Sequence, residues 1–223
     1  MAPPNRKLGI WTGQALDLTG LFVLLGLVVE TWLYFGHPTP IAFWVAVTIP
    51  IMYQVFVWLT WRLEFRSQAT SQTIGFFGYV SLFFVLFEGR FVSLLILAWL
   101  DRGSLHLHII PQVSTTILFG ALGLYAIYSV KRYFGMKRAA GADHFDSSYR
   151  TLPPVTEGIF RYTRNGMYVY AFLLFWMIAI GLDSSAALVV AAFTHAYIWV
   201  HFYATEKPDM DYLYASSQGS TER

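Results

Sequence analysis

Apolar residues are gathered along this chain into long runs that end at charged residues or at helix breakers. The runs cover residues 16–35, 41–61, 74–100, 109–130, 167–182 and 186–203. A helix that crosses the hydrocarbon core of a bilayer needs roughly 20 mostly apolar residues, and most of the runs approach or exceed that length. The pattern therefore predicts an all-α integral membrane protein with about six transmembrane helices.

Lysine and arginine are distributed unevenly between the two sides of these predicted spans. If the N-terminus lies in the cytoplasm, all but two of the 15 basic residues fall in cytoplasmic segments, the exceptions being Arg90 and Arg102. Cytoplasmic loops of membrane proteins carry an excess of Lys and Arg, and an odd number of spans would remove the bias. We therefore expect six spans with both termini in the cytoplasm, in the inner membrane of a bacterium.

The composition excludes several classes of function. Of the 223 residues, 56 % are hydrophobic and 13 % are charged, and there is no cysteine. Without cysteine the chain has no disulfide framework, no thiol nucleophile and no cysteine-ligated zinc or iron–sulfur site. The formal charge of +2 is too small to favour nucleic acid. We therefore expect that the protein binds neither a metal nor a nucleic acid. We expect it to lie in the membrane.

One long polar connection, Lys131–Asn165, interrupts the otherwise short loops. A long ordered connection in a compact protein is often functional. We expect a single domain over residues 1–214, in which residues 1–110 supply N-terminal spans and residues 111–214 form the functional half. Residues 215–223 are polar and are expected to form a disordered tail.

Polar side chains gather where the last two predicted spans meet the cytoplasm. The segment Gly158–Tyr168 enters the fifth span, and the segment His195–Met210 leaves the sixth. Only a few residues join these spans, so they should form an antiparallel hairpin that brings Asn165–Tyr168 beside Thr205 and Glu206. A pocket for a ligand is therefore expected at the cytoplasmic ends of the C-terminal helices.

The chemistry of these residues suits a zwitterionic, nucleotide-like ligand. Backbone N–H groups at the start of the fifth span, with Arg161 or Arg164, can bind a carboxylate. Glu206 can accept hydrogen bonds from an amine or a ribose. The ring of Tyr168 can stack on adenine or face a sulfonium cation.

In their order and spacing these residues resemble a known family. Gly158–Tyr168, followed after about forty residues by Glu206-Lys207-Pro208, resembles the membrane phospholipid methyltransferases and the isoprenylcysteine carboxyl methyltransferases. Those proteins carry an Arg-His/Asn-Pro-Met-Tyr-x-Gly motif and then an acidic pair after the last span. The segment Tyr133–Phe145 also looks like bacterial members, and the resemblance covers roughly residues 120–214. This chain departs from the motif at three positions, with Gly166 for the proline, Tyr170 for the final glycine and Thr205 for the first acidic residue.

The resemblance implies an enzyme that transfers a methyl group from S-adenosylmethionine to an amphiphilic acceptor in the membrane. It implies a cofactor site that comprises Arg161, Arg164, Asn165, Gly166, Met167, Tyr168 and Glu206. A phospholipid amine such as that of phosphatidylethanolamine is the favoured acceptor. Carboxyl methylation of isoprenylcysteine, or methylation of another small or lipid acceptor, stays open. A non-enzymatic membrane scaffold or transporter subunit is the alternative from another class.

An amine acceptor must lose a proton before it attacks a methyl group, and Glu206 or His201 is the candidate catalytic base. Ionisable residues at membrane depth are costly and often functional. Glu88 and Arg90 lie inside the predicted span 74–100. They are expected either to pair with each other or a neighbour, or to bind the headgroup of the acceptor.

Overall fold

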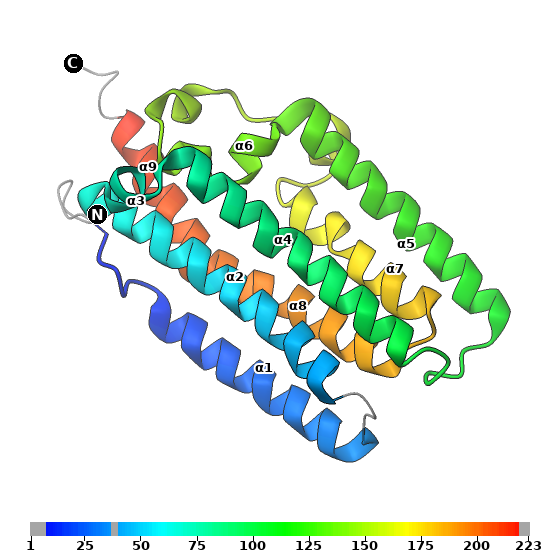
Figure 1. Ribbon diagram of the computed structural model, residues 1–223. Helices are drawn as coiled ribbons and strands as arrows, with labels where there is room; N and C mark the ends of the chain where they lie inside the picture. Colours follow the sequence, from blue (N-terminus) through cyan, green and yellow to red (C-terminus); the bar gives the residue numbers. More distant parts are fainter. Residues whose placement is uncertain (1–7, 37–39, 219–223) are drawn as a thin grey trace.

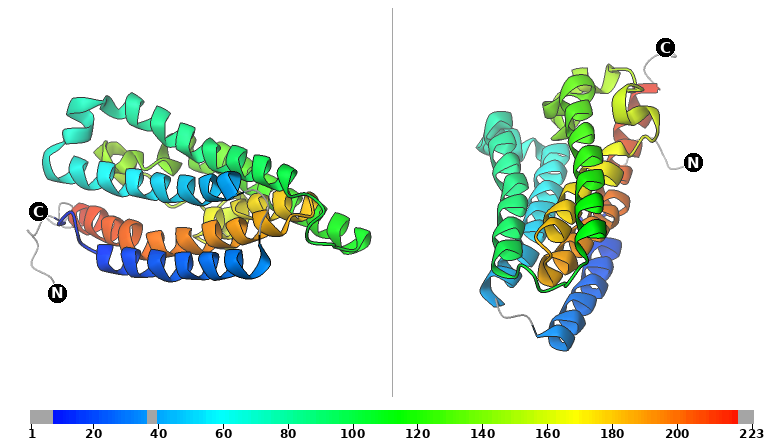
Figure 2. Two further views of the ribbon diagram at one scale, coloured as in Figure 1. Left: turned by 60° about the horizontal axis from the view of Figure 1, so that its bottom comes forward. Right: turned by 90° about the vertical axis from the view of Figure 1, so that its right-hand side faces the viewer.

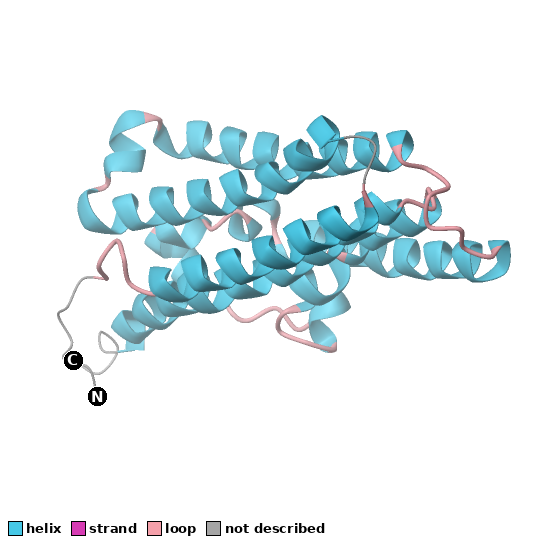
Figure 3. Ribbon diagram, turned by 90° about the horizontal axis from the view of Figure 1, so that it is seen from below, coloured by secondary structure: helices cyan, strands magenta, loops and turns pink. Residues whose placement is uncertain are grey.

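The computed structural model describes residues 8–36 and 40–218, and in that part of the chain every regular element is helical (Figure 3). The apolar helices are α1 (Gln14–Phe35), α2 (Pro40–Ser67), α4 (Gly75–Leu100), α5 (Ile109–Ser129), α7 (Leu173–Gly181) and α8 (Ser185–His201). A π-helical turn, η5 (Met167–Ala171), leads directly into α7. The all-α membrane fold predicted from the apolar runs is confirmed.

The helices differ in how far they can reach across a bilayer. Five of the helical stretches in the described residues are long and apolar enough to cross a membrane, and the sixth, Met167–Gly181, is shorter. At a rise of about 1.5 Å per residue, this shorter helix spans less than the roughly 30 Å hydrocarbon core. α1 begins and α9 (Lys207–Gln218) ends at the same end of the bundle (Figure 1).

α2 continues to Ser67, six residues beyond the end that the apolar run predicts. The apolar run predicts an end at Trp61 because Arg62 and Glu64 follow. Both charged side chains are buried, however, and both have partners. Arg62 forms an ion pair with Asp209, and the Glu64 carboxylate accepts hydrogen bonds from the backbone and side chain of Ser71. Tertiary contacts thus allow the helix to continue through two charges.

The last apolar helix also extends beyond its predicted end. α8 passes through a π-helical turn, η6 (Phe202–Glu206), straight into α9. Pro208 is the second residue of α9 and directly follows the π-helical turn, where the regular helical hydrogen bonding is already interrupted. α9 reaches Gln218, four residues into the segment expected to be disordered, and the rest of that tail, residues 219–223, lies outside the described residues.

α8 is the central helix of the bundle, in contact with α1, α2, α4 and α7. Figure 2 shows α1 running along α8, with α5 on the far side against α7. Three alanines of α8, Ala186, Ala187 and Ala191, are fully buried. Small residues of this kind let membrane helices approach closely, so α8 can touch neighbours on several sides.

Residues 130–166, here called the cap segment, connect α5 to η5 over one end of the bundle, here called the loop end (Figure 1). The cap segment consists of short helical turns: η1 (Val130–Phe134), α6 (Met136–Ala139), η2 (Ala142–His144), η3 (Ser147–Thr151) and η4 (Gly158–Arg161). The short helix α3 (Ala69–Thr73) joins α2 to α4 at the same end. The cap segment packs on α2 through η2 and on α9 through η3.

Candidate functional site

A cavity of about 350 Å³ lies inside the bundle, lined by residues of α2, α4, α5, η5, α7 and α8 and of the cap segment. Most of its wall is aromatic or aliphatic. Its polar and ionisable wall residues are Tyr53, Gln54, Glu88, Arg90, Tyr168, His201 and Glu206. One cavity therefore contains residues that were predicted for three different roles: acceptor binding, cofactor binding and proton transfer. These residues come from separate segments of the sequence.

Three π-helical turns in the described chain border this cavity. η1 contributes Val130, η5 contributes Met167 and Tyr168, and η6 contributes Glu206. Within this wall the Tyr168 hydroxyl donates a hydrogen bond to the Glu206 carboxylate, which joins η5 to η6 as the predicted hairpin requires. π-helical turns interrupt the regular hydrogen bonding of a helix and occur frequently at functional sites.

Arg90 is a buried cation that faces aromatic rings in place of an anion. Its guanidinium carbon lies 4.1 Å from the ring centre of Tyr53 and 4.7 Å from that of Phe87. Its Nε atom has no hydrogen-bond partner, and no ion pair of Arg90 is found among the described residues. Glu88 is exposed on the rim of the cavity and does not pair with it, because residues two apart on a helix do not face each other.

Two more buried residues of the cavity wall each have one polar atom without a hydrogen-bond partner. Gln54 is 2 % exposed with its Oε1 unpaired, and His201 is 2 % exposed with its Nε2 unpaired. Buried polar atoms are nearly always hydrogen-bonded in native proteins. Together with Arg90, they offer an acceptor, a titratable nitrogen and a cation to a polar ligand inside an apolar wall.

The structure divides the predicted cofactor residues into those that line the cavity and those, including Asn165 and Gly166, that do not. Met167, Tyr168 and Glu206 line the cavity. Arg161 and Arg164 are exposed on the cap segment, away from the cavity wall. The prediction of unpaired backbone N–H groups at this helix start is wrong for Tyr168 and Val169, which both donate to the Asn165 carbonyl.

The three departures from the family motif are accommodated by packing outside the cavity. A Cβ atom on Gly166 would lie 2.7 Å from Cγ2 of Ile159, so this residue is part of a tight contact. Tyr170 packs in a hydrophobic cluster with Ile159 and Phe160. Thr205 is fully buried and accepts a hydrogen bond of 3.0 Å from the Gln14 amide on α1. None of these side chains narrows the cavity.

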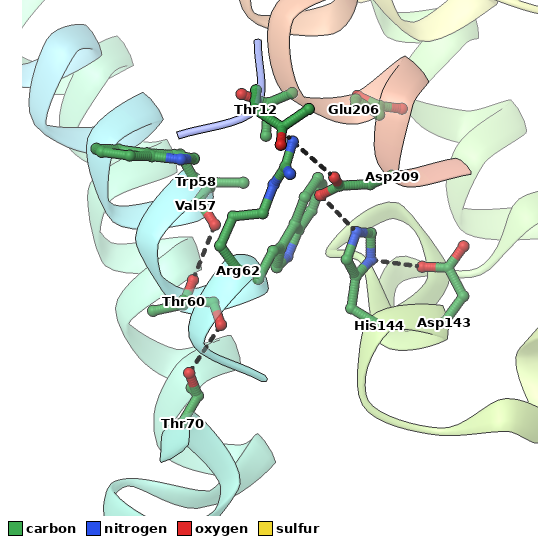
Figure 4. A network of polar contacts seen from close by, with 12 residues as sticks. Thr12, Val57, Trp58, Thr60, Arg62, Thr70, Asp143, His144, Glu206 and Asp209 are labelled. Atoms are coloured by element: carbon green, nitrogen blue, oxygen red, sulfur yellow. Dashed lines mark hydrogen bonds and ion pairs between the residues drawn. The ribbon is translucent and has the colours of Figure 1, made fainter. Parts of the chain in front are cut away.

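A second polar cluster at the loop end was not predicted from the sequence (Figure 4). Arg62 Nη2 lies 2.9 Å from Asp209 Oδ1, and the other oxygen of Asp209 lies 3.4 Å from His144 Nε2. His144 Nδ1 lies 3.0 Å from Asp143 Oδ1. These four buried side chains, here called the charge network, join α2, η2 and α9. The signal available in the sequence was the presence of charges directly after apolar runs.

The charge network holds His144 between two carboxylates. Burial alone lowers the pKa of His144, but its contacts with the carboxylates of Asp143 and Asp209 outweigh burial and raise it. Burial likewise raises the pKa of Asp143, but its hydrogen bonds with His144 and Tyr214 outweigh this and lower it. The His144 ring also stacks on Trp61 at 3.8 Å, and Trp61 lines the cavity. The network therefore positions one wall of the site.

Residues 112–217 match the model of a family described as phospholipid methyltransferase. The comparison with curated proteins and the comparison with solved structures gave no match. The matched segment contains Tyr168, His201 and Glu206, whereas Gln54 and Arg90 belong to α2 and α4, which precede it. Within residues 8–36 and 40–218, no group of three or more His, Cys, Asp or Glu side chains is placed to hold a metal ion.

Proposed function

Residues 112–217 are a domain of the phospholipid methyltransferase family, and on that premise we propose that this membrane methyltransferase transfers a methyl group from S-adenosylmethionine to the amine of a phospholipid headgroup. Phosphatidylethanolamine is the simplest acceptor of this class. Its headgroup carries a phosphate and a primary amine, so it needs an anion-binding group and an amine-binding group within one cavity.

One observation carries the proposal: the cavity wall holds buried polar residues with atoms that have no hydrogen-bond partner. Arg90 lacks an anion, and Gln54 and His201 each have an unpaired atom. Leaving a charge buried and unpaired is costly, so this wall is suited to a ligand that brings the missing charge. The phosphate of a phospholipid supplies an anion for Arg90, and its ammonium group supplies donors for Gln54 and His201.

The acceptor has a direct route from the bilayer. Glu88 of α4 and Leu124 of α5 both line the cavity, and both are exposed on the outer surface of the bundle. In a membrane this surface faces the lipid chains, so the rim between α4 and α5 can admit a headgroup whose acyl chains stay in the bilayer.

The residues present fit the cofactor in chemical type. Tyr168 and the other aromatic rings of the wall can face a sulfonium cation, and Met167 can contact the adenine. The Glu206 carboxylate can accept hydrogen bonds from the ribose or the amino group. S-adenosylmethionine, when bound, supplies an already activated methyl group. The protein then has to align donor and acceptor, exclude water and remove the proton of the amine.

Arg161 and Arg164 fit a different role. They are exposed on the cap segment together with Lys131, Arg132 and Lys137. Basic residues at this level are typical of the cytoplasmic face of a membrane protein and of contact with lipid phosphates. We propose that the loop end faces the cytoplasm of a bacterial cell, where S-adenosylmethionine is available.

Calorimetric titration of the detergent-purified protein with S-adenosylmethionine and with S-adenosylhomocysteine tests the cofactor site. We expect binding to the wild type and a loss of about 5- to 150-fold in Glu206→Gln, since a lost buried hydrogen bond costs about 1–3 kcal/mol. The matched control is Glu157→Gln, an exposed glutamate of the cap segment, which should bind like the wild type.

The possible results separate the alternatives. Donor binding with methylation of an isoprenylcysteine analogue, and none of phosphatidylethanolamine, would move the activity to carboxyl methylation. A folded wild type that binds neither ligand would contradict the enzyme and favour a non-enzymatic scaffold or transporter subunit.

A further inference from the structure

We infer that Asp17 on α1 positions His201, so that Nε2 of His201 takes the proton from the acceptor amine before methyl transfer. This inference rests on the proposed function and adds a residue that lies outside the matched family segment of residues 112–217. His201 touches the reacting amine in this account and is the catalytic base, whereas Asp17 is a positioning residue.

Asp17 is a buried carboxylate on the predominantly apolar helix α1. Its side chain is 9 % exposed, and its two oxygens both face residues of α8. Oδ2 accepts a hydrogen bond of 3.1 Å from the Tyr197 hydroxyl, and Oδ1 lies 3.8 Å from Nδ1 of His201. An acidic residue in the first turn of a helix is favoured by the helix dipole, but that effect requires neither burial nor orientation toward a histidine.

The backbone of α1 is held close to α8 and η6 by two glycines. A Cβ atom on Gly20 would lie 2.6 Å from the Val200 side chain, and one on Gly13 would lie 1.8 Å from the Ala204 carbonyl oxygen. The close approach on both sides of Asp17 fixes its carboxylate beside His201.

The two nitrogens of His201 have different surroundings. Nδ1 faces Asp17, whereas Nε2 is buried without a partner and the residue lines the cavity. A carboxylate beside one nitrogen of an imidazole favours the proton on that nitrogen and leaves the lone pair on the other. The arrangement therefore leaves Nε2 of His201, a residue of the cavity wall, available to take a proton.

Glu206 is less suited to take this proton. Its carboxylate already accepts the hydrogen bond of Tyr168, and in the proposed site it also binds the donor. The charged and titratable groups around His201 are Asp17 on α1, Tyr197 and Glu206 on its own helical stretch, and Tyr168, Arg90 and Tyr53 in the same cavity.

The step balances as follows. The ammonium group of the headgroup gives one proton to Nε2 of His201, and the electron pair of the broken N–H bond stays on nitrogen. That pair forms a bond to the methyl carbon of the sulfonium donor, and the C–S bond breaks with its electrons passing to sulfur. The products are a methylated ammonium, a neutral thioether and an imidazolium ion paired with Asp17, which later loses its proton to water.

Asp17→Asn is the sharpest test because it removes the charge and keeps both the size of the side chain and an acceptor for Tyr197. We expect the initial rate of methyl transfer to phosphatidylethanolamine to fall at least tenfold at neutral pH, since a positioned general base contributes about 10²–10⁴-fold. The dissociation constant of S-adenosylmethionine should not change. The loss should shrink as the pH rises toward the pKa of a primary amine, because the acceptor then loses its proton without help.

Two further variants separate positioning from simple packing. Gln14→Met breaks a buried contact of α1 with η6 near the same site and should keep the wild-type rate. Asp17→Glu keeps a carboxylate and should retain more activity than Asp17→Asn. This variant also keeps the inference testable if Asp17→Asn folds poorly. If the wild type is active and Asp17→Asn is equally active, the inference is overturned and the proposed function stands. The same holds if Asp17→Asn and Gln14→Met share a loss of activity that does not depend on pH. A wild type that neither binds the donor nor transfers methyl would overturn the proposed function, and this inference with it.

Discussion

Arg62 and Arg90 are both buried arginines of this bundle, but their surroundings are opposite. Arg62 has an ion pair of 2.9 Å with Asp209 and donates to the carbonyls of Gly9 and Thr12. Arg90 has aromatic rings around it and no ion pair within the described residues. A buried charge that is satisfied within the fold serves the fold, whereas one that is left without an anion is available to a ligand. The following substitutions test that distinction.

The largest effect is expected from Arg62→Met. It leaves Asp209 buried beside His144 without its main counter-charge, which typically costs about 3–5 kcal/mol of stability. Thermal unfolding in detergent should show a clear decrease in Tm. The double variant Arg62→Met with Asp209→Leu removes both charges and should recover part of the loss. An unchanged Tm in the single variant would mean that the ion pair does not hold the loop end together.

Arg90→Met should give the reverse pattern. Stability should stay equal or rise, because an uncompensated buried charge is removed. Methyl transfer to phosphatidylethanolamine should fall by about 30-fold or more, as expected when one partner of a buried charge pair is lost on binding at 2–5 kcal/mol. Arg102→Met, an exposed arginine at the opposite end, is the control. A destabilised but fully active Arg90→Met would assign this residue to the fold.

The charge network also predicts how stability depends on pH. A histidine with a raised folded-state pKa contributes stability below its unfolded pKa of about 6.5 and loses it as the pH rises through the folded value. His144 is such a group, so the Tm should fall as the pH is raised above this range. His144→Gln should flatten the dependence. The pKa of Asp143 is lowered in the folded state, so its contribution to stability is lost at acidic pH, as the pH falls through that lowered pKa.

The smallest effect is expected from Arg161→Gln and Arg164→Gln. Both side chains are exposed outside the cavity, and exposed charges contribute about 0–1 kcal/mol to an interaction. We expect the dissociation constant of S-adenosylmethionine in titration calorimetry to change by less than about fivefold. A loss as large as that of Glu206→Gln would show that the cofactor extends over the cap segment, and would revise the site.

The sequence predicts the helices well where burial in lipid alone decides the structure. The runs 16–35, 74–100 and 109–130 correspond closely to α1, α4 and α5, because any apolar stretch of this length is helical in a bilayer. It fails at α2, where Arg62 is retained in the helix by a residue 147 positions later. Such a partner is created by the tertiary fold and has no local pattern.

The site shows the same division. The hydrogen bond between Tyr168 and Glu206 follows from motif spacing and from a short hairpin, and both features are visible in the sequence. Gln54 and Asp17 are polar residues within predominantly apolar helices, and nothing near them in the sequence indicates a common cavity or a histidine partner. Conversely, Arg161 and Arg164 have the right chemistry for a carboxylate, but the fold of the cap segment turns them outward.

The most direct test of the account is methyl transfer by the purified protein in vesicles of phosphatidylethanolamine, with the methyl group of S-adenosylmethionine labelled and the extracted lipid analysed by mass spectrometry. The account predicts labelled N-methylated phosphatidylethanolamine with the wild type and a strong decrease with Glu206→Gln. A folded wild type that labels the lipid no more than Glu206→Gln does would contradict it.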